Sequence, residues 1–91
     1  MRRILLIAAL LIPMLPSAQI IHVLDRETRE PIEFAEIYSF YPQAYATTNS
    51  NGEAEMSEFA GADSIEIRNL GYETFVTSFS QLQASGFEVR L

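Results

Sequence analysis

Apolar residues occupy every second position in two stretches of this chain, and that period limits what the chain can fold into. Residues 64–68 place isoleucine at positions 65 and 67 between polar residues, and residues 87–91 place apolar side chains at positions 87, 89 and 91. Successive side chains of a β-strand point to opposite faces of a sheet, so the pattern predicts strands with one buried face. The residues expected in a core are Ile65, Ile67, Val89 and Leu91, and those expected outside are Glu66, Glu88 and Arg90.

Five further segments have the composition of strands. Residues 20–24 form a nearly continuous apolar run, which is typical of a central strand. The other four are β-branched, aromatic-rich or weakly alternating, at residues 34–40, 45–49, 53–57 and 72–79. About seven short strands with turn residues between them predict an all-β fold, a small Greek-key β-sandwich. A helix is expected only as a single turn at residues 81–84, with Ser80 as its N-cap.

The first eighteen residues have the composition of a secretory signal peptide. Arg2 and Arg3 precede an apolar run at residues 4–12, and small residues follow at positions 17 and 18. A membrane anchor is the alternative, but a spanning helix needs about 20 apolar residues. We therefore expect residues 1–18 to be removed on export to the periplasm or outer membrane, leaving one domain at residues 19–91 with no membrane span of its own.

The charge of residues 19–91 narrows the classes of partner. Four arginines and no lysine stand against twelve Asp and Glu, a formal charge of −8. This balance repels phosphates and anionic lipid headgroups, which argues against binding to nucleic acid or a membrane surface. The acids also have a simpler role in keeping a small exported domain soluble. The chain has no cysteine, so it must fold without disulfides.

The Asn51-Gly52 pair predicts a type I′ hairpin turn between residues 46–49 and 53–56, because both residues accept positive φ. A calcium site is the alternative, since Asn49, Asn51 and Glu53 place oxygen donors at alternate positions. Calcium takes six to eight oxygens, and this loop offers one carboxylate. We expect no metal site and no cofactor.

No catalytic residue is expected. A nucleophile needs a nearby base, and the single histidine, His22, lies within a predicted strand of a chain without Cys or Lys. We interpret His22 as a structural or surface residue of that strand. The carboxylates of Glu27, Glu30, Glu33 and Glu36 straddle a predicted turn and are interpreted as a solvated rim.

Across residues 20–91 the chain resembles the carboxypeptidase-regulatory-like domain, a transthyretin-like sandwich. The matching positions are turn and core residues: Asp25, Thr28, Pro31, Ile32, Ala35, Asn49, Ser50, Asn51, Gly52, Asp63, Ile65, Gly71, Tyr72, Glu73 and Leu91. In TonB-dependent outer-membrane receptors this domain precedes the plug. The enzyme of this fold that opens hydroxyisourate uses His and Arg with a C-terminal Tyr-Arg-Gly-Ser, whereas this chain ends Glu-Val-Arg-Leu.

A cluster of aromatic residues is the segment most suited to contact a partner. Tyr38, Phe40, Tyr41 and Tyr45 bracket a proline in what we expect to be an exposed loop, and tyrosine is favoured at interfaces. Such rings also stack on sugars. In the alternative interpretation, Tyr38 and Phe40 pack into one end of the sandwich and the others are incidental surface.

The resemblance implies a non-catalytic accessory domain of a TonB-dependent receptor system, whose partner is the plug domain or another periplasmic or outer-membrane protein. The 91 residues leave no room for a plug and a barrel. The expectation is therefore the N-terminal piece of a longer receptor or, alternatively, a stand-alone exported sandwich that binds a protein or a glycan.

Overall fold

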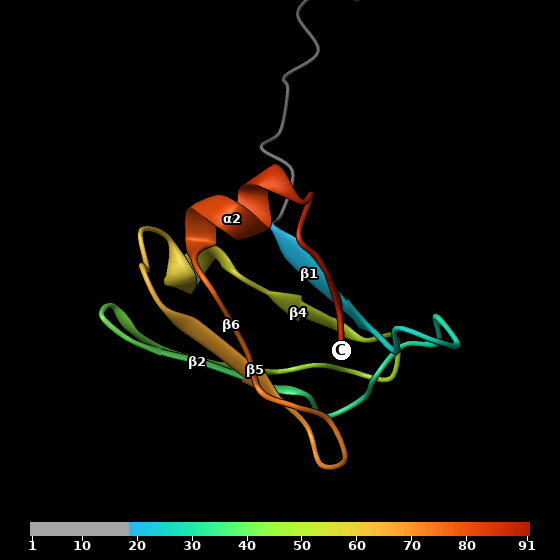
Figure 1. Cartoon of the computed structure of the whole chain (residues 1–91). Coiled ribbons are helices and arrows are strands. Elements are labelled where there is room, and N and C mark those ends of the chain that lie inside the picture. The colour runs from blue at the N-terminus through green and yellow to red at the C-terminus, as the bar shows by residue number, and fades with distance from the viewer. Residues whose placement is uncertain (1–18) are drawn as a thin grey trace, which may run out of the picture.

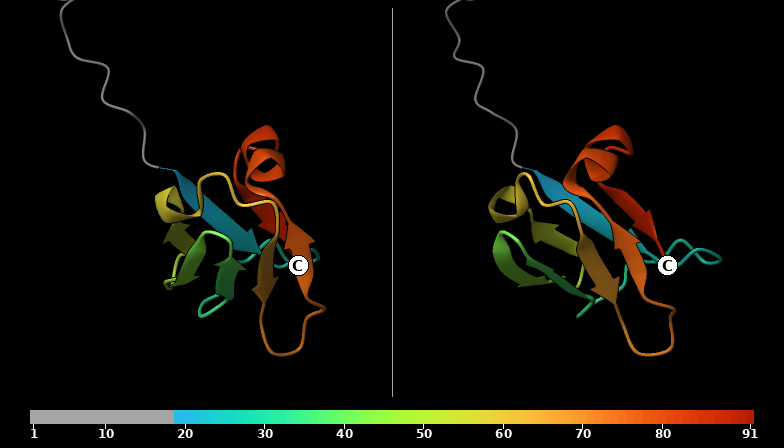
Figure 2. Two further views of the ribbon diagram at one scale, coloured as in Figure 1. Left: turned by 90° about the vertical axis from the view of Figure 1, so that its left-hand side faces the viewer. Right: turned by 60° about the vertical axis from the view of Figure 1, so that its left-hand side comes forward.

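The computed structural model describes residues 19–91, which fold into two β-sheets packed face to face (Figure 1 and Figure 2). The expected signal peptide at residues 1–18 lies outside the described residues. The elements are β1 (Ile20–Leu24), β2 (Glu36–Phe40), β3 (Gln43–Thr47), β4 (Glu53–Glu55), the 3₁₀ helix η1 (Ser57–Phe59), β5 (Ile65–Arg68), β6 (Phe75–Thr77), α2 (Phe79–Ala84) and β7 (Glu88–Arg90). The expected seven-stranded β-sandwich is confirmed.

The sheets contain three and four strands, in the orders β4-β1-β7 and β3-β2-β5-β6. β1 is antiparallel to β4 and parallel to β7, whereas every pair in the second sheet is antiparallel. The apolar run of β1 thus lies in the centre of its sheet, as expected, with Ile21 and Val23 fully buried. α2 connects β6 to β7 and covers one end of the sandwich (Figure 1). Within residues 19–91 there is no helix with the length and apolarity needed to cross a membrane.

The alternating segments place their side chains on the expected faces. Ile65, Ile67 and Val89 are buried, Glu88 and Arg90 are exposed, and Glu66 is half-buried. Leu91 is only partly buried, because β7 ends one residue earlier, and it packs against the edge of the core. The core also contains Ile21, Val23, Ile32, Ala35, Ile37, Ala44, Met56, Phe59, Ala62, Phe79 and Leu82.

Several strands are shorter than the segments predicted from composition, and a local cause is visible for β2 and β6. β2 begins at Glu36 because Phe34 has a φ of 61° and lies 68% exposed outside the strand. β6 ends at Thr77 because Ser78 starts α2: its side chain accepts a hydrogen bond from the Gln81 amide at 3.2 Å. The predicted cap at Ser80 is therefore wrong by two residues, and the helix is longer than the expected single turn.

The Asn51-Gly52 turn does not close a hairpin. β3 and β4 belong to different sheets, and Gly52 has a positive φ (71°) whereas Asn51 does not, so the turn is not type I′. The Asn49 side-chain oxygen instead accepts hydrogen bonds from the backbone amides of Asn51, at 2.9 Å, and Glu53, at 3.0 Å. An oxygen that was counted toward a calcium site thus forms this turn, which carries the chain from one sheet to the other.

Candidate partner-binding surface

The aromatic cluster lies on a β-hairpin rather than in a loop. Phe40 pairs with Gln43, so only Tyr41 and Pro42 connect β2 to β3. Sequence composition led to the expectation of a loop because of the proline, but the proline is confined to the two-residue connection. Three of the four rings are therefore held on a paired backbone.

The register of the hairpin directs the rings away from the core. Ile37, Ser39 and Ala44 are buried, so their strand neighbours Tyr38, Phe40 and Tyr45 project from the outer face of the four-stranded sheet. Phe40 is 67% exposed, Tyr45 61% and Tyr41 89%. The interpretation in which Tyr38 and Phe40 pack into the sandwich is wrong.

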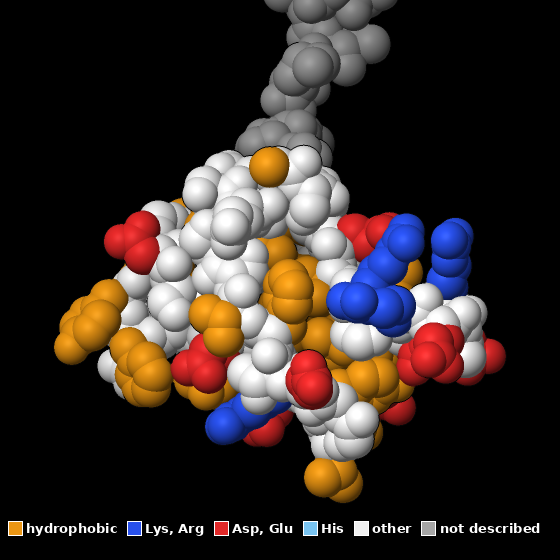
Figure 3. Space-filling model, in the orientation of Figure 1, with side chains coloured by type: hydrophobic (Ala, Val, Ile, Leu, Met, Phe, Trp, Pro, Cys, Tyr) orange, Lys and Arg blue, Asp and Glu red, His pale blue; other side chains and the backbone are white. Residues whose placement is uncertain are grey.

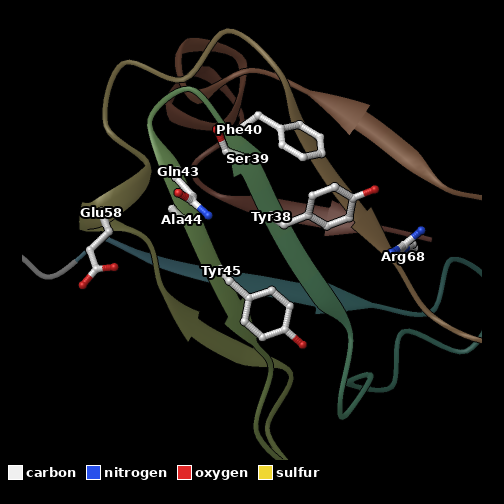
Figure 4. A pocket seen from close by; sticks show the side chains of 8 residues that line it. All are labelled: Tyr38, Ser39, Phe40, Gln43, Ala44, Tyr45, Glu58 and Arg68. Carbon is white, nitrogen blue, oxygen red and sulfur yellow. The ribbon is translucent and has the colours of Figure 1, made fainter.

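Tyr38 is the most enclosed ring of this surface. The rings of Tyr38 and Phe40 meet edge to face, with centroids 5.7 Å apart, and the Arg68 guanidinium lies 4.8 Å from the Tyr38 centroid (Figure 4). Burial and the neighbouring Glu66 carboxylate raise the pKa of the Tyr38 hydroxyl, against the opposing charge of Arg68. Tyr38 is opposite Tyr45 on β3, whose hydroxyl donates to the Glu36 carboxylate at 3.4 Å.

Two shallow hollows flank Phe40. The larger, of about 420 Å³, lies along the hairpin, and its lining includes Tyr38, Tyr45, Glu58 and Arg68 (Figure 4). The smaller, of about 290 Å³, lies at the hairpin tip and is lined by Phe40, Tyr41, Asp63 and Ser64. We refer to the outer face of this sheet, with both hollows, as the aromatic face.

Arg68, Glu58 and Asp63 were not predicted from the sequence as residues of a binding surface. The alternation in β5 could have placed Arg68 on the outer face of the sheet, because Arg68 follows the buried Ile67 as Glu66 follows the buried Ile65. Glu58 and Asp63 precede β5 and approach the hairpin only through the fold. No local pattern marks them.

His22 lies on the outer face of the other sheet. Its Nε2 atom is 2.8 Å from the Glu53 carboxylate, its cross-strand neighbour on β4. The arrangement is a surface ion pair when the imidazole is protonated, and among residues 19–91 no Ser or Thr hydroxyl hydrogen-bonds to this imidazole. Within the part of the chain that the structure describes, no three His, Asp or Glu side chains gather as metal ligands. Of the expected acidic rim, Glu27, Glu30 and Glu33 are exposed and Glu36 is half-buried.

Asp25 is the most strongly perturbed carboxylate of the described chain. Its Oδ2 atom accepts a hydrogen bond from the Tyr72 hydroxyl at 2.6 Å. Its Oδ1 atom accepts hydrogen bonds from the backbone amides of Glu27 and Thr28, both at 2.8 Å. These bonds, the one from Tyr72 foremost, lower the pKa of Asp25 to about 2. Asp25 raises the pKa of the Tyr72 phenol in turn. The pair ties the β1–β2 connection to the β5–β6 connection and leaves neither group poised for proton transfer near neutral pH.

This perturbation predicts a pH dependence of stability. A carboxylate whose pKa falls on folding stabilises the fold above its unfolded pKa, here near 3.8, and loses that contribution as the pH falls toward 2. We expect the Asp25 carboxyl carbon to titrate near pH 2 by NMR. In Tyr72→Phe it should titrate closer to its ordinary value, because the largest stabilising bond is gone. An Asp25 that titrates near pH 4 in the folded wild type would contradict the geometry.

Comparison of the chain with protein-family models, with curated proteins and with solved structures found no match.

Proposed function

We propose that residues 19–91 form a non-catalytic accessory domain that acts in the periplasm by contact with a protein of a TonB-dependent receptor system, its plug domain in particular. Support for the class comes from the seven-stranded sandwich and from the resemblance to carboxypeptidase-regulatory-like domains. β1 begins at Ile20, two residues after the expected signal cleavage site, so removal of residues 1–18 would leave every strand intact. The mature protein should begin at Gln19.

The observation that carries this proposal is the difference between the two outer faces of the sandwich. The three-stranded sheet presents mostly charged groups: His22, Glu53, Glu55, Glu88 and Arg90. The four-stranded sheet presents the rings of the aromatic face, and on the same side of this sheet Val76 of β6, two strands away from β2, is 60% exposed. In Figure 3 hydrophobic side chains project at the left-hand edge, where Figure 1 shows the hairpin of β2 and β3.

Exposed aromatics on a rigid hairpin suit a binding role. Grouped apolar side chains on a soluble domain are characteristic of interaction sites. The backbone of Tyr38, Phe40 and Tyr45 is already ordered by strand pairing, so binding needs to restrict little more than ring rotation. Tyrosine adds a hydroxyl that can bond to a partner at the polar rim.

The proposal predicts that two tyrosines of the aromatic face are needed for partner capture. Crosslinking or pull-down in a strain that expresses the matching receptor should compare wild type with Tyr41→Ala and Tyr45→Ala. Each truncation should weaken capture about tenfold, the effect of a residue that contributes about 1.4 kcal/mol. Both side chains are largely exposed, so melting temperatures should stay near that of wild type.

Leu70→Ala is the matched control for this experiment. Leu70 is 97% exposed in the β5–β6 connection, away from the hairpin tip. Its loss should leave capture unchanged. Equal capture by wild type and both tyrosine variants would rule out the aromatic face as the interface.

The non-catalytic part of the proposal has its own test. His22 and Glu53 lie on the charged face, opposite the aromatic face, and the chain contains neither Cys nor Lys. Purified protein should therefore not turn over hydroxyisourate. Turnover above the spontaneous rate would overturn this assignment.

A second candidate is a stand-alone exported sandwich that binds a protein or a glycan through the same face. The exposed rings of Tyr41 and Tyr45 favour it, because flat rings stack on sugars. The reading frame after codon 91 separates the candidates: continuation into a plug segment supports the receptor, and a stop supports the stand-alone protein. Loss of oligosaccharide binding, rather than protein capture, in Tyr41→Ala would favour the glycan.

A further inference from the structure

The hollow at the tip of the β2–β3 hairpin combines two exposed rings with a carboxylate. Phe40 and Tyr41 come from the hairpin, whereas Asp63 and Ser64 come from the segment that enters β5. All four side chains are exposed to solvent. With a volume of about 290 Å³, the hollow lies at the lower limit for ligand pockets, about 300 to 1,000 Å³. It suits the end of one side chain better than a cofactor.

The Asp63 side chain in this hollow has no partner among the described residues. In residues 19–91 it has neither a hydrogen-bond donor nor a basic side chain within ion-pair distance. Other carboxylates of the domain are engaged: Asp25 with Tyr72, Glu53 with His22 and Glu88 with Arg90. Several remaining acids are also free, but Asp63 is the one that lines a hollow with both Phe40 and Tyr41.

We propose that this hollow accepts the cationic end of one Lys or Arg side chain from a protein partner. A cation is attracted both to the face of an aromatic ring and to a carboxylate beside it. The same sheet face already contains such a contact, because Arg68 lies over the Tyr38 ring at 4.8 Å. The proposal rests on the proposed function, since it specifies the chemistry with which the partner meets the aromatic face.

The charge of the domain agrees with a basic partner. The described residues carry four arginines against twelve acids, and a negative domain attracts positively charged segments and repels negative ones. The second hollow adds to this selection, because Glu58 lines it beside Phe40 and Tyr45 and has no ion-pair partner in the described chain. A basic segment that crosses the hairpin would meet both carboxylates.

A fragment titration tests the hollow without a known partner. The ¹⁵N-labelled protein is titrated with n-butylammonium chloride, which reproduces the end of a lysine side chain, and separately with n-butanol and with sodium chloride. We expect saturable amide shifts at millimolar butylammonium, concentrated at Tyr41, Asp63 and Ser64. Butanol and sodium chloride should produce at most small, non-saturating shifts there. Equal shifts with butanol would overturn the proposal, because the hollow would then select for apolar character alone.

Variants at the two carboxylates sharpen the test. Asp63→Asn keeps the size of the side chain and should weaken butylammonium binding about two- to fivefold, the range of an exposed ion pair. Glu58→Gln is the matched control, because Glu58 lines the neighbouring hollow and not this one. Its titration at Tyr41 and Asp63 should match wild type. Unchanged binding by Asp63→Asn would overturn the proposal.

The fragment titration and the capture experiment can fail separately. If Tyr41→Ala loses the partner but Asp63→Asn retains it in full, the aromatic face is the interface and the cationic contact is refuted. If butylammonium binds through Asp63 while neither tyrosine variant affects capture, the hollow binds a cation, but the proposed function and the role of this hollow in partner binding fail.

Discussion

Ile67→Ala should lower the free energy of unfolding by about 2–5 kcal/mol. Ile67 is fully buried in β5, where it is flanked by its cross-strand partners Ile37 on β2 and Phe75 on β6. Truncation removes apolar contacts and leaves a cavity that paired strands on both sides cannot collapse to fill. A domain of this size buries only about 60% of its unfolded surface, and this one has no disulfide to add stability. Urea denaturation should show a large fall in the midpoint.

Val76→Ala is the control for that variant. Val76 lies on β6, the neighbouring strand, but it is 60% exposed on the outer face. Removing two exposed methyl groups should change stability by no more than about 1 kcal/mol, the span of strand propensities. An Ile67→Ala protein that melts within a degree or two of wild type would show that the register of β5 is wrong.

Gly52→Ala should destabilise the domain by about 2–6 kcal/mol, through two effects that add. Gly52 has a φ of 71°, which costs about 1–3 kcal/mol for a residue with a side chain. A Cβ atom there would also lie 2.6 Å from the backbone oxygen of Val23 and 3.0 Å from the Pro31 side chain. Overpacking of this kind costs about 1–3 kcal/mol more. Thermal and urea denaturation measure the sum.

Gly86→Ala separates the two effects. Gly86 has nearly the same backbone angle, a φ of 69°, but a Cβ atom there meets nothing within 4 Å. It should show the conformational cost alone, so Gly52→Ala should be clearly the more destabilising of the two. Equal losses would mean that the turn moves away from Val23 without cost and that the close approach contributes nothing.

Local sequence patterns determined where the strands lie in the chain. For the two strands with the clearest alternation, they also determined which face is buried. The alternation in β5 and β7 predicted which residues are buried, because the period of a strand depends only on the geometry of successive residues. The nearly continuous apolar run of β1 predicted a central strand, because strands in the interior of a fold are often apolar at successive positions. Seven such segments sufficed to predict a sandwich.

In the β2–β3 hairpin, local sequence patterns did not predict which side chains face the core. Aromatic and buried positions alternate in β2, but the sequence does not state which set faces the core, since each set contains at least one large apolar side chain, Phe40 in one and Ile37 in the other. Tertiary packing determines the buried face: Ile37 lies next to its cross-strand partner Ile67 in the interior, and the aromatic rings lie on the outer face. The same choice created the candidate site, and no sequence motif could have joined Asp63 to it.

Only the tertiary structure determines how the chain passes from β3 in one sheet to β4 in the other. An Asn-Gly pair between two strand-like segments predicts a hairpin locally. Here the Val23 amide of β1 donates a hydrogen bond to the Gly52 carbonyl oxygen at 2.8 Å, and β4 pairs with β1 instead of β3. Just before the turn, buried Thr48 bonds to Ile32 and Ala35 through its hydroxyl, at 2.6 and 2.8 Å, and holds the end of β3 against the segment that leads into β2. These bonds join residues far apart in the chain. Which strand a turn leads to therefore depends on the surfaces that must be buried together, and a window of a few residues does not contain that information.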